Sequence, residues 1–360
     1  MKKNRKNSLS NYALVLTVIF FFATNKIMAN PMDSLIVEVE VSEFIYENAS
    51  FLQSHASTIA ETDEGLVAAW FGGTHEKHPD VSIYSSIRTE EGWSFPQKIA
   101  DGVINDTLRY PCWNPVLYNV PNGSLMLFYK VGPTVEDWWG MVKESADNGK
   151  TWSEAERLPE GLLGPIKNKP VLINDSILIA PSSTESKTEY DWRVHFEISK
   201  DFGKTWRLVG PISEENKYDI IQPSILHYND GRLQMLARSN HDFVMSSWSM
   251  DNGETWSEPE PTMLPNPNSG TDAVTLQNGL QLIVYNNSKR EEGKNGGPRT
   301  ALNIAVSEDG KDWKMIYTLE DTTPGEFSYP AVIQGKDGDI HITYTYNRDT
   351  IKYVRLKVIK

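Results

Sequence analysis

Three segments of the chain repeat one eight-residue pattern: SADNGKTW at 145–152, SKDFGKTW at 199–206 and SMDNGETW at 249–256. SEDGKDW at 307–313 is one residue shorter, and residues 86–93 keep only the Ser, the Gly-Trp pair and the spacing. The Asp carboxylate and Ser hydroxyl can bond backbone donors inside a turn, Gly accepts a strained backbone, and Trp can pack between neighbouring units. These segments therefore predict structural turns, with structural aspartates at Asp147, Asp201 and Asp251.

A second repeat runs out of phase with the first and consists of a turn signal followed by alternating apolar residues. Asn and Gly mark hairpins because they tolerate the left-handed backbone that a tight turn needs. The six turns are Asp63-Glu64-Gly65, Asn122-Gly123, Asn174-Asp175-Ser176, Asp230-Gly231, Asn278-Gly279 and Asp337-Gly338. Consecutive turns lie 48 to 59 residues apart. Six units of this length, each with about four short strands, predict an all-β, six-bladed β-propeller.

The N-terminal segment has the layout of a secretory signal. Lys and Arg residues within 2–6 precede an apolar run at 13–23 and a small residue at Ala29. The run is shorter than the roughly 20 apolar residues that span a bilayer. We therefore expect a signal peptide at 1–29, a periplasmic or secreted protein, and no membrane span after the signal is removed.

The stretch SLIVEVEV at 34–41 predicts a strand that joins the last blade. Closure by both ends of the chain removes free sheet edges, so a second domain is not required. We therefore expect residues 30–360 to form one domain.

Composition narrows the possible partners. The 360 residues carry a formal net charge of −13, which repels polyanions and argues against nucleic acid. The single cysteine, Cys112, cannot form an internal disulfide. No Rossmann glycine pattern, phosphate loop or Cys/His metal spacing occurs, so we expect no cofactor and no metal. An acidic substrate would need a local cationic site.

The repeated Ser-x-Asp-x-Gly-x-x-Trp turns resemble the Asp-boxes of sialidase-like propellers, and the resemblance covers nearly all of the chain after residue 29. Asp-boxes identify architecture and not chemistry. The resemblance implies an active site at the central depression of the ring, built from inner strands and their loops. It also implies a terminal acidic sugar of an oligosaccharide as substrate.

The resemblance implies arginines that clamp the substrate carboxylate. The Arg-Ile-Pro motif that opens a typical sialidase falls on residues 54–57, so its arginine is here His55. The second and third arginines resemble Arg238 and Arg299, which can still make charge-assisted, bidentate bonds to one carboxylate. Two further arginines fit solvated surface positions better: Arg232 and Arg348.

The family nucleophile is a tyrosine on the last blade, and Tyr329 lies at the matching point. The glutamate that would activate this tyrosine falls sixteen residues before the second arginine, on Gln222. An amide can orient a phenol but cannot take its proton. The sequence leaves Glu326, His55 or another nearby group as the base.

The general acid of the family belongs to the loop at 71–80. Glu76 lies nearest to the expected position, with Asp80 as competitor. His75 and His78 lie in the same loop, which follows two glycines and suits a mobile cover over a site.

Other segments precede or enter inner-strand regions and could supply substrate-binding groups, although a structural role fits each one better. Their polar residues are Arg109, Lys167, Lys169 and Asp272. Trp138-Trp139 could form an aromatic platform for a sugar, although packing between blades fits this pair better.

Three functions remain open. The first is a retaining exo-glycosidase with Tyr329 as nucleophile and Glu76 as acid. The second is a lyase or dehydratase acting on uronate-containing oligosaccharides, in which His55, His75, His78 and Tyr329 supply base and acid. The third is a glycan-binding propeller without catalysis. The fold analogy favours the first and the departures at His55 and Gln222 favour the second.

Overall fold

The computed structural model describes residues 31–186, 191–213 and 217–359, so the predicted signal at 1–29 lies outside the described residues. The chain divides into two compact units, Met1–Ser34 and Leu35–Lys360. The described end of the first unit is a 3-10 helix, η1 (Pro31–Ser34). Across the described ranges, no helix has the length and apolar character needed to cross a membrane.

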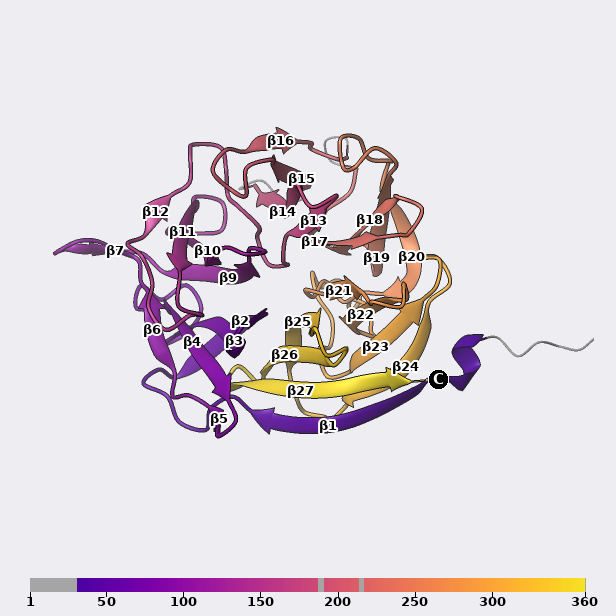
Figure 1. The fold of residues 1–360 in the computed structure, drawn as a ribbon, viewed down its shortest axis with the longest axis horizontal. Coiled ribbons are helices and arrows are strands. Elements are labelled where there is room, and N and C mark those ends of the chain that lie inside the picture. The colour runs from indigo at the N-terminus through magenta and orange to yellow at the C-terminus, as the bar shows by residue number, and fades with distance from the viewer. Residues whose placement is uncertain (1–30, 187–190, 214–216, 360) are drawn as a thin grey trace, which may run out of the picture. The chain divides into compact units, whose positions relative to one another are not determined.

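The second unit consists of six antiparallel sheets arranged around a ring (Figure 1), which confirms the all-β, six-bladed β-propeller. A small separate hairpin, β7 (Val103–Asn105) with β8 (Leu108–Arg109), connects the first two blades.

The first three blades follow one another along the chain. Blade 1 contains β2 (Gln53–Thr62), β3 (Gly65–Gly73), β4 (Ser82–Thr89), β5 (Gly92–Trp93) and β6 (Gln97–Ala100). Blade 2 contains β9 (Cys112–Asn119), β10 (Leu125–Val131), β11 (Trp139–Ser145) and β12 (Glu156–Arg157). Blade 3 contains β13 (Val171–Ile173), β14 (Ile177–Glu185), β15 (Trp192–Ser199) and β16 (Arg207–Val209).

The remaining blades complete the ring. Blade 4 contains β17 (Ile220–His227), β18 (Leu233–Ser239), β19 (Phe243–Ser249) and β20 (Glu260–Pro265). Blade 5 contains β21 (Asp272–Thr275), β22 (Gln281–Asn286), β23 (Leu302–Ser307) and β24 (Lys314–Glu320). Blade 6 contains β25 (Phe327–Gln334), β26 (Ile340–Tyr346), β27 (Thr350–Ile359) and β1 (Ile36–Phe44).

Strand β1 closes the ring as the sequence predicts. It pairs antiparallel with β27, from Ile36 opposite Ile359 to Phe44 opposite Lys352 (Figure 1). The two ends of the described chain thus complete one sheet, and β27 is left without a free edge.

The predicted Asx-Gly turns join the first and second strands of the blades. Gly338, between β25 and β26, has a φ of +89°, and Asn122, between β9 and β10, has a φ of +57°. Left-handed backbone at these positions explains why Asn and Gly recur there. The alternating apolar residues that follow form strands whose side chains fill the space between blades.

The Ser-x-Asp-x-Gly-x-x-Trp segments form turns between the third and fourth strands of a blade. In the turn at 145–152, Asp147 Oδ1 accepts from the Thr151 backbone N–H at 2.8 Å and from Ser145 Oγ at 2.8 Å. The tryptophan of the turn at 249–256, Trp256, stacks on Phe196 of blade 3 with ring centroids 4.3 Å apart. These residues therefore hold the turns and join neighbouring blades.

Candidate functional site

Bulges in the innermost strands direct side chains toward the centre of the ring. In β2, β17 and β25, two residues oppose a single residue of the neighbouring strand. The first residues of these pairs are Ala56, Gln222 and Tyr329, with φ angles of 56°, 57° and 52°. A left-handed backbone costs a non-glycine residue about 1–3 kcal/mol and is concentrated at functional sites. Proline follows Gln222 and Tyr329, a residue that a bulge tolerates because it needs no N–H donor there.

Tyr329 lies in the middle of a group of polar side chains. Arg238 Nη1 donates to its phenol oxygen at 2.6 Å, and Gln222 Nε2 lies 3.4 Å from the same oxygen. The His55 ring packs against the Tyr329 ring with centroids 4.1 Å apart. Tyr329 itself is only half-buried. We call the following residues the central cluster: His55, Gln222, Arg238, Arg299, Tyr329 and Arg348.

Positive side chains surround the Tyr329 ring. The guanidinium carbons of Arg238 and Arg299 lie 5.8 and 5.9 Å from the ring centre, and Lys167 Nζ lies 5.8 Å from it. Arg238 belongs to β18 of blade 4, Arg299 lies between β22 and β23 of blade 5, and Lys167 precedes β13 of blade 3. A chain with a net charge of −13 thus gathers two guanidinium groups and one lysine amine around one phenol.

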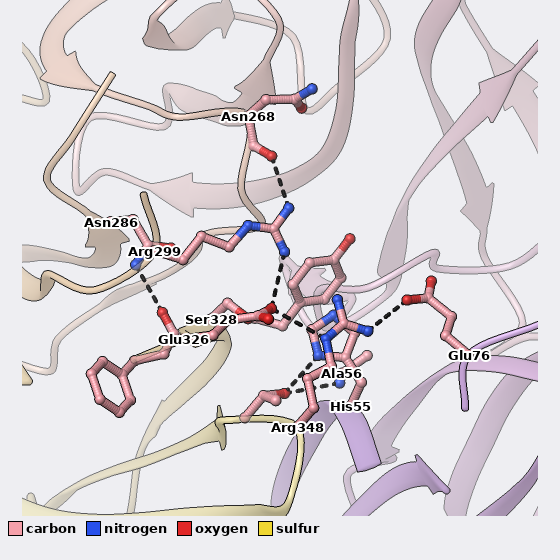
Figure 2. Close-up of polar contacts among 12 residues, drawn as sticks. His55, Ala56, Glu76, Asn268, Asn286, Arg299, Glu326, Ser328 and Arg348 are labelled. Atoms are coloured by element: carbon pink, nitrogen blue, oxygen red, sulfur yellow. Dashed lines mark hydrogen bonds and ion pairs between the residues drawn. The ribbon is translucent and has the colours of Figure 1, made fainter. Parts of the chain in front are cut away.

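The Glu326 carboxylate links Arg299 to Arg348 (Figure 2). Glu326 Oε1 lies 3.4 Å from Arg299 Nη1 and 3.2 Å from Arg348 Nε. Arg348 Nη1 pairs with Glu76 Oε2 at 2.6 Å, and Arg299 Nη2 donates to the backbone oxygen of Asn268 at 3.2 Å. Of the loop at 71–80, Glu76 is therefore the carboxylate that reaches the central cluster.

Arg348 was expected at the solvated surface, and that expectation is wrong. Its side chain is 22% exposed, and it pairs with Glu326 and Glu76. The register of β25 and β26 places Phe327 opposite Tyr346, so Arg348 in the following turn lies next to Glu326. Counting residue pairs outward from the predicted Asp337-Gly338 turn would have revealed this neighbour.

His55 is neutral in this setting. Its side chain is buried, and Nδ1 lies 2.9 Å from Thr345 Oγ1. Burial, assisted by the positive charges of Arg348 and Arg299, holds the pKa of His55 well below its usual range. His55 therefore adds no charge to the central cluster near neutral pH.

Lys167 forms a cross-link beneath Tyr329. Its Nζ donates to Asn168 Oδ1 at 2.8 Å, to the Thr271 backbone oxygen at 3.0 Å and to the Pro330 backbone oxygen at 2.6 Å. Burial lowers the pKa of Lys167 to about 7, while Asp272 opposes that shift. With three acceptors around its Nζ, Lys167 braces the backbone next to Tyr329.

Asp272 makes structural contacts with neighbouring blades. Its carboxylate accepts from Ser224 Oγ at 3.0 Å and from the Val332 backbone N–H at 2.8 Å, and it pairs with Lys169 at 2.9 Å. The side chain is 2% exposed. These contacts join segments of blades 3 to 6, so the position of Asp272 fits a structural role better than the substrate-binding role considered from the sequence.

Residues 64–342, most of the chain, match the family described as BNR repeat-like domain. The chain belongs to the BNR repeat-like domain family. Membership accounts for the repeated turns.

One curated relative of this BNR repeat-like chain is the anhydrosialidase of Macrobdella decora. It is 22% identical over 225 residues, which cover 56% of this chain and 29% of the relative. The chain thus spans less than a third of the length of the curated relative that it matches.

Two solved structures illustrate the likeness in fold. A Dyadobacter fermentans protein of unknown function matches with a TM-score of 0.72 at 17% identity, covering 90% of this chain and 99% of that one. The NanB sialidase of Streptococcus pneumoniae matches with a TM-score of 0.69 at 12% identity, covering 88% of this chain and 70% of that one. At these identities the likeness shows the sialidase-like propeller fold alone.

The other residues predicted for the loop at 71–80 hold the loop itself. Asp80 accepts from the Thr74 backbone N–H at 3.0 Å and from Thr74 Oγ1 at 2.6 Å, and His78 Nδ1 lies 2.7 Å from its carboxylate. Arg109 donates to the Asp80 backbone oxygen at 2.9 Å. Within the described ranges no hydrogen bond or ion pair joins the central cluster to four predicted residues: His75, His78, Asp80 and Arg109.

The chemistry available in this BNR repeat-like propeller is that of guanidinium groups, a phenol, a neutral imidazole and the carboxylates of Glu76 and Glu326. Within the described ranges no carboxylate hydrogen-bonds the Tyr329 phenol, whose partners are Arg238 and Gln222. The same ranges contain no group of three or more His, Cys, Asp or Glu side chains placed to hold a metal ion. The cluster can bind an anion and move a proton or a glycosyl group at the phenol oxygen.

Proposed function

We propose that this BNR repeat-like protein is a carbohydrate-active enzyme that acts on the terminal acidic sugar of an oligosaccharide, as an exo-glycosidase. The observation that carries the proposal is the convergence of Arg238, Arg299 and Lys167 on the half-buried Tyr329. Cations concentrated around a reactive group in an acidic protein suit an anionic ligand. The names of the relatives, an anhydrosialidase and a sialidase, support the same substrate class.

The substrate carboxylate would bind to the guanidinium groups. Arg238 uses Nε for Asn268 and Nη1 for Tyr329 and Gln222, and no described residue accepts from its Nη2. Arg299 likewise uses both Nη atoms and has no acceptor for Nε among the described residues. These remaining donors suit charge-assisted bonds to a carboxylate.

In the proposed hydrolysis, Tyr329 gives its phenol proton to water and its oxygen attacks the anomeric carbon, while Glu76, which has taken up a proton from water, protonates the departing glycosidic oxygen. A guanidinium that donates to the phenol oxygen stabilises the phenolate, so Arg238 supports the nucleophile where a glutamate base is replaced by Gln222. Glu76 is paired with Arg348, and that ion pair must open before Glu76 can deliver a proton. A substrate carboxylate that takes the place of Glu76 on Arg348 would release it. Water then cleaves the glycosyl–tyrosine bond.

Elimination is the second candidate, and the neutral His55 against the Tyr329 ring favours it. A neutral imidazole can take the proton next to a carboxylate that arginines have neutralised, while Tyr329 protonates the leaving oxygen. The product would be an unsaturated sugar acid. No covalent bond to the enzyme would form.

The deciding experiment incubates the protein with sialosides and with uronate-containing oligosaccharides. Ultraviolet absorbance reports a new conjugated double bond, and a fluorinated-sugar trap with intact-mass spectrometry reports a covalent adduct. An adduct on Tyr329 that Tyr329→Phe abolishes supports hydrolysis, and Tyr317→Phe on the outer strand β24 is the matched control. An unsaturated product without an adduct supports elimination. Failure to bind or cleave any acidic sugar contradicts both.

Export remains part of the proposal, because it depends on residues 1–29. Fractionation of cells that express the full chain would test it, and retention of the intact signal in the cytoplasmic fraction would contradict it.

A further inference from the structure

A cavity of about 320 Å³ lies between blades 2 and 3, and we call it the Trp139 pocket. Trp138, Trp139 and Leu162 contribute to its apolar wall, and Arg157, Thr184 and Glu185 contribute polar groups. Small-molecule sites are typically cavities of about 300–1,000 Å³ with an apolar lining and a few convergent polar groups. The Trp139 pocket has this composition.

The Trp139 pocket adjoins the central cluster through packed side chains. Glu185 on β14 pairs in register with Trp192 on β15, and the Arg238 guanidinium lies 5.6 Å above the Trp192 ring. On the other wall, Trp138 packs with Ile166, the residue before Lys167. Residues that line the pocket thus neighbour Trp192 and Ile166, which in turn neighbour Arg238 and Lys167.

The Trp139 pocket has the opposite charge from the central cluster. Three carboxylates line it, those of Glu136, Glu160 and Glu185, against the single guanidinium of Arg157. Like charges brought together in a binding site cost several kcal/mol, so this lining rejects an acidic sugar. It accepts an uncharged one, whose hydroxyl groups donate to carboxylates and whose carbon faces contact indole rings.

The Glu185 carboxylate has no hydrogen bond or ion pair with any described side chain, and the residue is half-buried at the wall of the pocket. Burial raises its pKa, with the charge of Arg238 opposing the shift. The exposed part of the side chain leaves the carboxylate open to a ligand in the pocket. A ligand hydroxyl in the Trp139 pocket would provide the partner.

We propose that the Trp139 pocket binds an uncharged pyranose, the sugar that follows the terminal acidic residue in the substrate. This inference rests on the proposed function, because the acidic sugar in the central cluster brings the second sugar to the pocket. The opposite charges of the two places would then select a chain in which an acidic sugar is followed by a neutral one.

The test compares two substrates with the same terminal acidic sugar, one linked to an uncharged pyranose and one to a methyl group. The wild-type protein should show a kcat/KM for the disaccharide that exceeds the value for the methyl glycoside. Glu185→Ala and Trp139→Ala should each lower this ratio about tenfold, which corresponds to 1.4 kcal/mol. Glu156→Ala changes an exposed carboxylate of β12 outside the pocket and should preserve the ratio.

A charge-reversal variant tests selectivity. Glu160→Lys should raise kcat/KM for a disaccharide whose second sugar is a uronate relative to the uncharged disaccharide. Equal wild-type kcat/KM values for the methyl glycoside and the uncharged disaccharide would overturn the proposal. The proposal would also be overturned if neither Glu185→Ala nor Trp139→Ala lowers the ratio of kcat/KM for the disaccharide to kcat/KM for the methyl glycoside.

A binding measurement separates failure of this proposal from failure of the proposed function. Saturation-transfer NMR with an uncharged methyl pyranoside needs no acidic sugar and no turnover. A signal that Trp139→Ala removes and Glu156→Ala retains supports the pocket even if no acidic sugar is cleaved. Cleavage of acidic sugars without this signal, and with the unchanged ratio described above, overturns the pocket and leaves the proposed function standing.

Discussion

Arg348 Nη1 lies 2.6 Å from Glu76 Oε2, although the two residues are 272 positions apart in the chain. Arg348 belongs to the last hairpin of blade 6 and Glu76 to the loop that follows β3 of blade 1. Closure of the ring is what brings them together. The pair couples the candidate acid to an arginine that the sequence placed at the surface.

Loss of Arg348 should weaken binding of an acidic sugar. The Arg348→Ala substitution should cost about 1.5–3 kcal/mol of binding free energy, the scale of a charge-assisted hydrogen bond. Isothermal titration calorimetry measures it. Arg232→Ala is the control, because Arg232 pairs with Asp230 at the surface and should leave the affinity unchanged. An unchanged Kd for Arg348→Ala would show that this arginine does not contact the ligand.

A glutamate at position 222 should distinguish the two mechanisms. The Gln222 side chain lies 3.4 Å from the Tyr329 oxygen, so Gln222→Glu places a base beside the phenol. For hydrolysis, kcat/KM should stay equal or rise, and Gln97→Glu on an exposed edge of blade 1 should change nothing. A fall of more than about tenfold, or 1.4 kcal/mol, would argue against Tyr329 as the nucleophile.

Removal of Trp256 should destabilise the fold without altering the site. The ring stacks on Phe196 of the preceding blade, so Trp256→Ala leaves a cavity between blades. We expect a loss of about 3 kcal/mol in the free energy of unfolding, the lower end for buried aromatics because Trp256 is half-buried. Chemical denaturation of Met250→Ala, which alters an exposed residue of the same turn, is the comparison. Equal midpoints for the two variants would contradict the packing role.

Stability should depend on pH through His55. Its folded-state pKa is lowered by burial, so below about pH 6.5 the unfolded chain binds the proton first. The contribution of His55 to the free energy of unfolding is therefore constant above pH 6.5. Below pH 6.5 the free energy of unfolding falls as the pH decreases, by at most about 1.4 kcal/mol per pH unit. Thermal melts of His55→Asn should fall less steeply between about pH 6.5 and 5 than those of the wild type. His75→Asn alters an exposed histidine and should retain the wild-type slope.

The architecture was accessible from the sequence because its signals are local. Each Asx-Gly turn needs a left-handed backbone within two residues, and Asp147 satisfies donors only four positions or fewer away. The alternation that follows each turn marks strands irrespective of their neighbours. Six such units in a row leave a ring as the arrangement that covers their apolar faces.

The candidate site could be predicted only in part from the sequence. His55, Gln222 and Tyr329 could be located because the resemblance to sialidase-like propellers implies a functional residue at each of these positions. The left-handed bulges that orient Gln222 and Tyr329 were not predicted. The proline that follows each residue is the feature of the sequence that indicates a bulge there. Arg348 was missed because its hairpin neighbour Glu326 was not counted from the predicted turn and its second partner, Glu76, is remote in the sequence.

The sequence by itself determined the strands, the turns and the number of blades, because each depends on contacts within one repeat or on a repeated pattern. Tertiary structure alone decided that Arg238, Arg299 and Lys167 surround Tyr329. It also decided that Arg348 meets Glu76 and that Glu185 faces a cavity without a partner. These side chains come from different blades, and their separation is set by the curvature of the closed ring, which no local pattern of residues encodes.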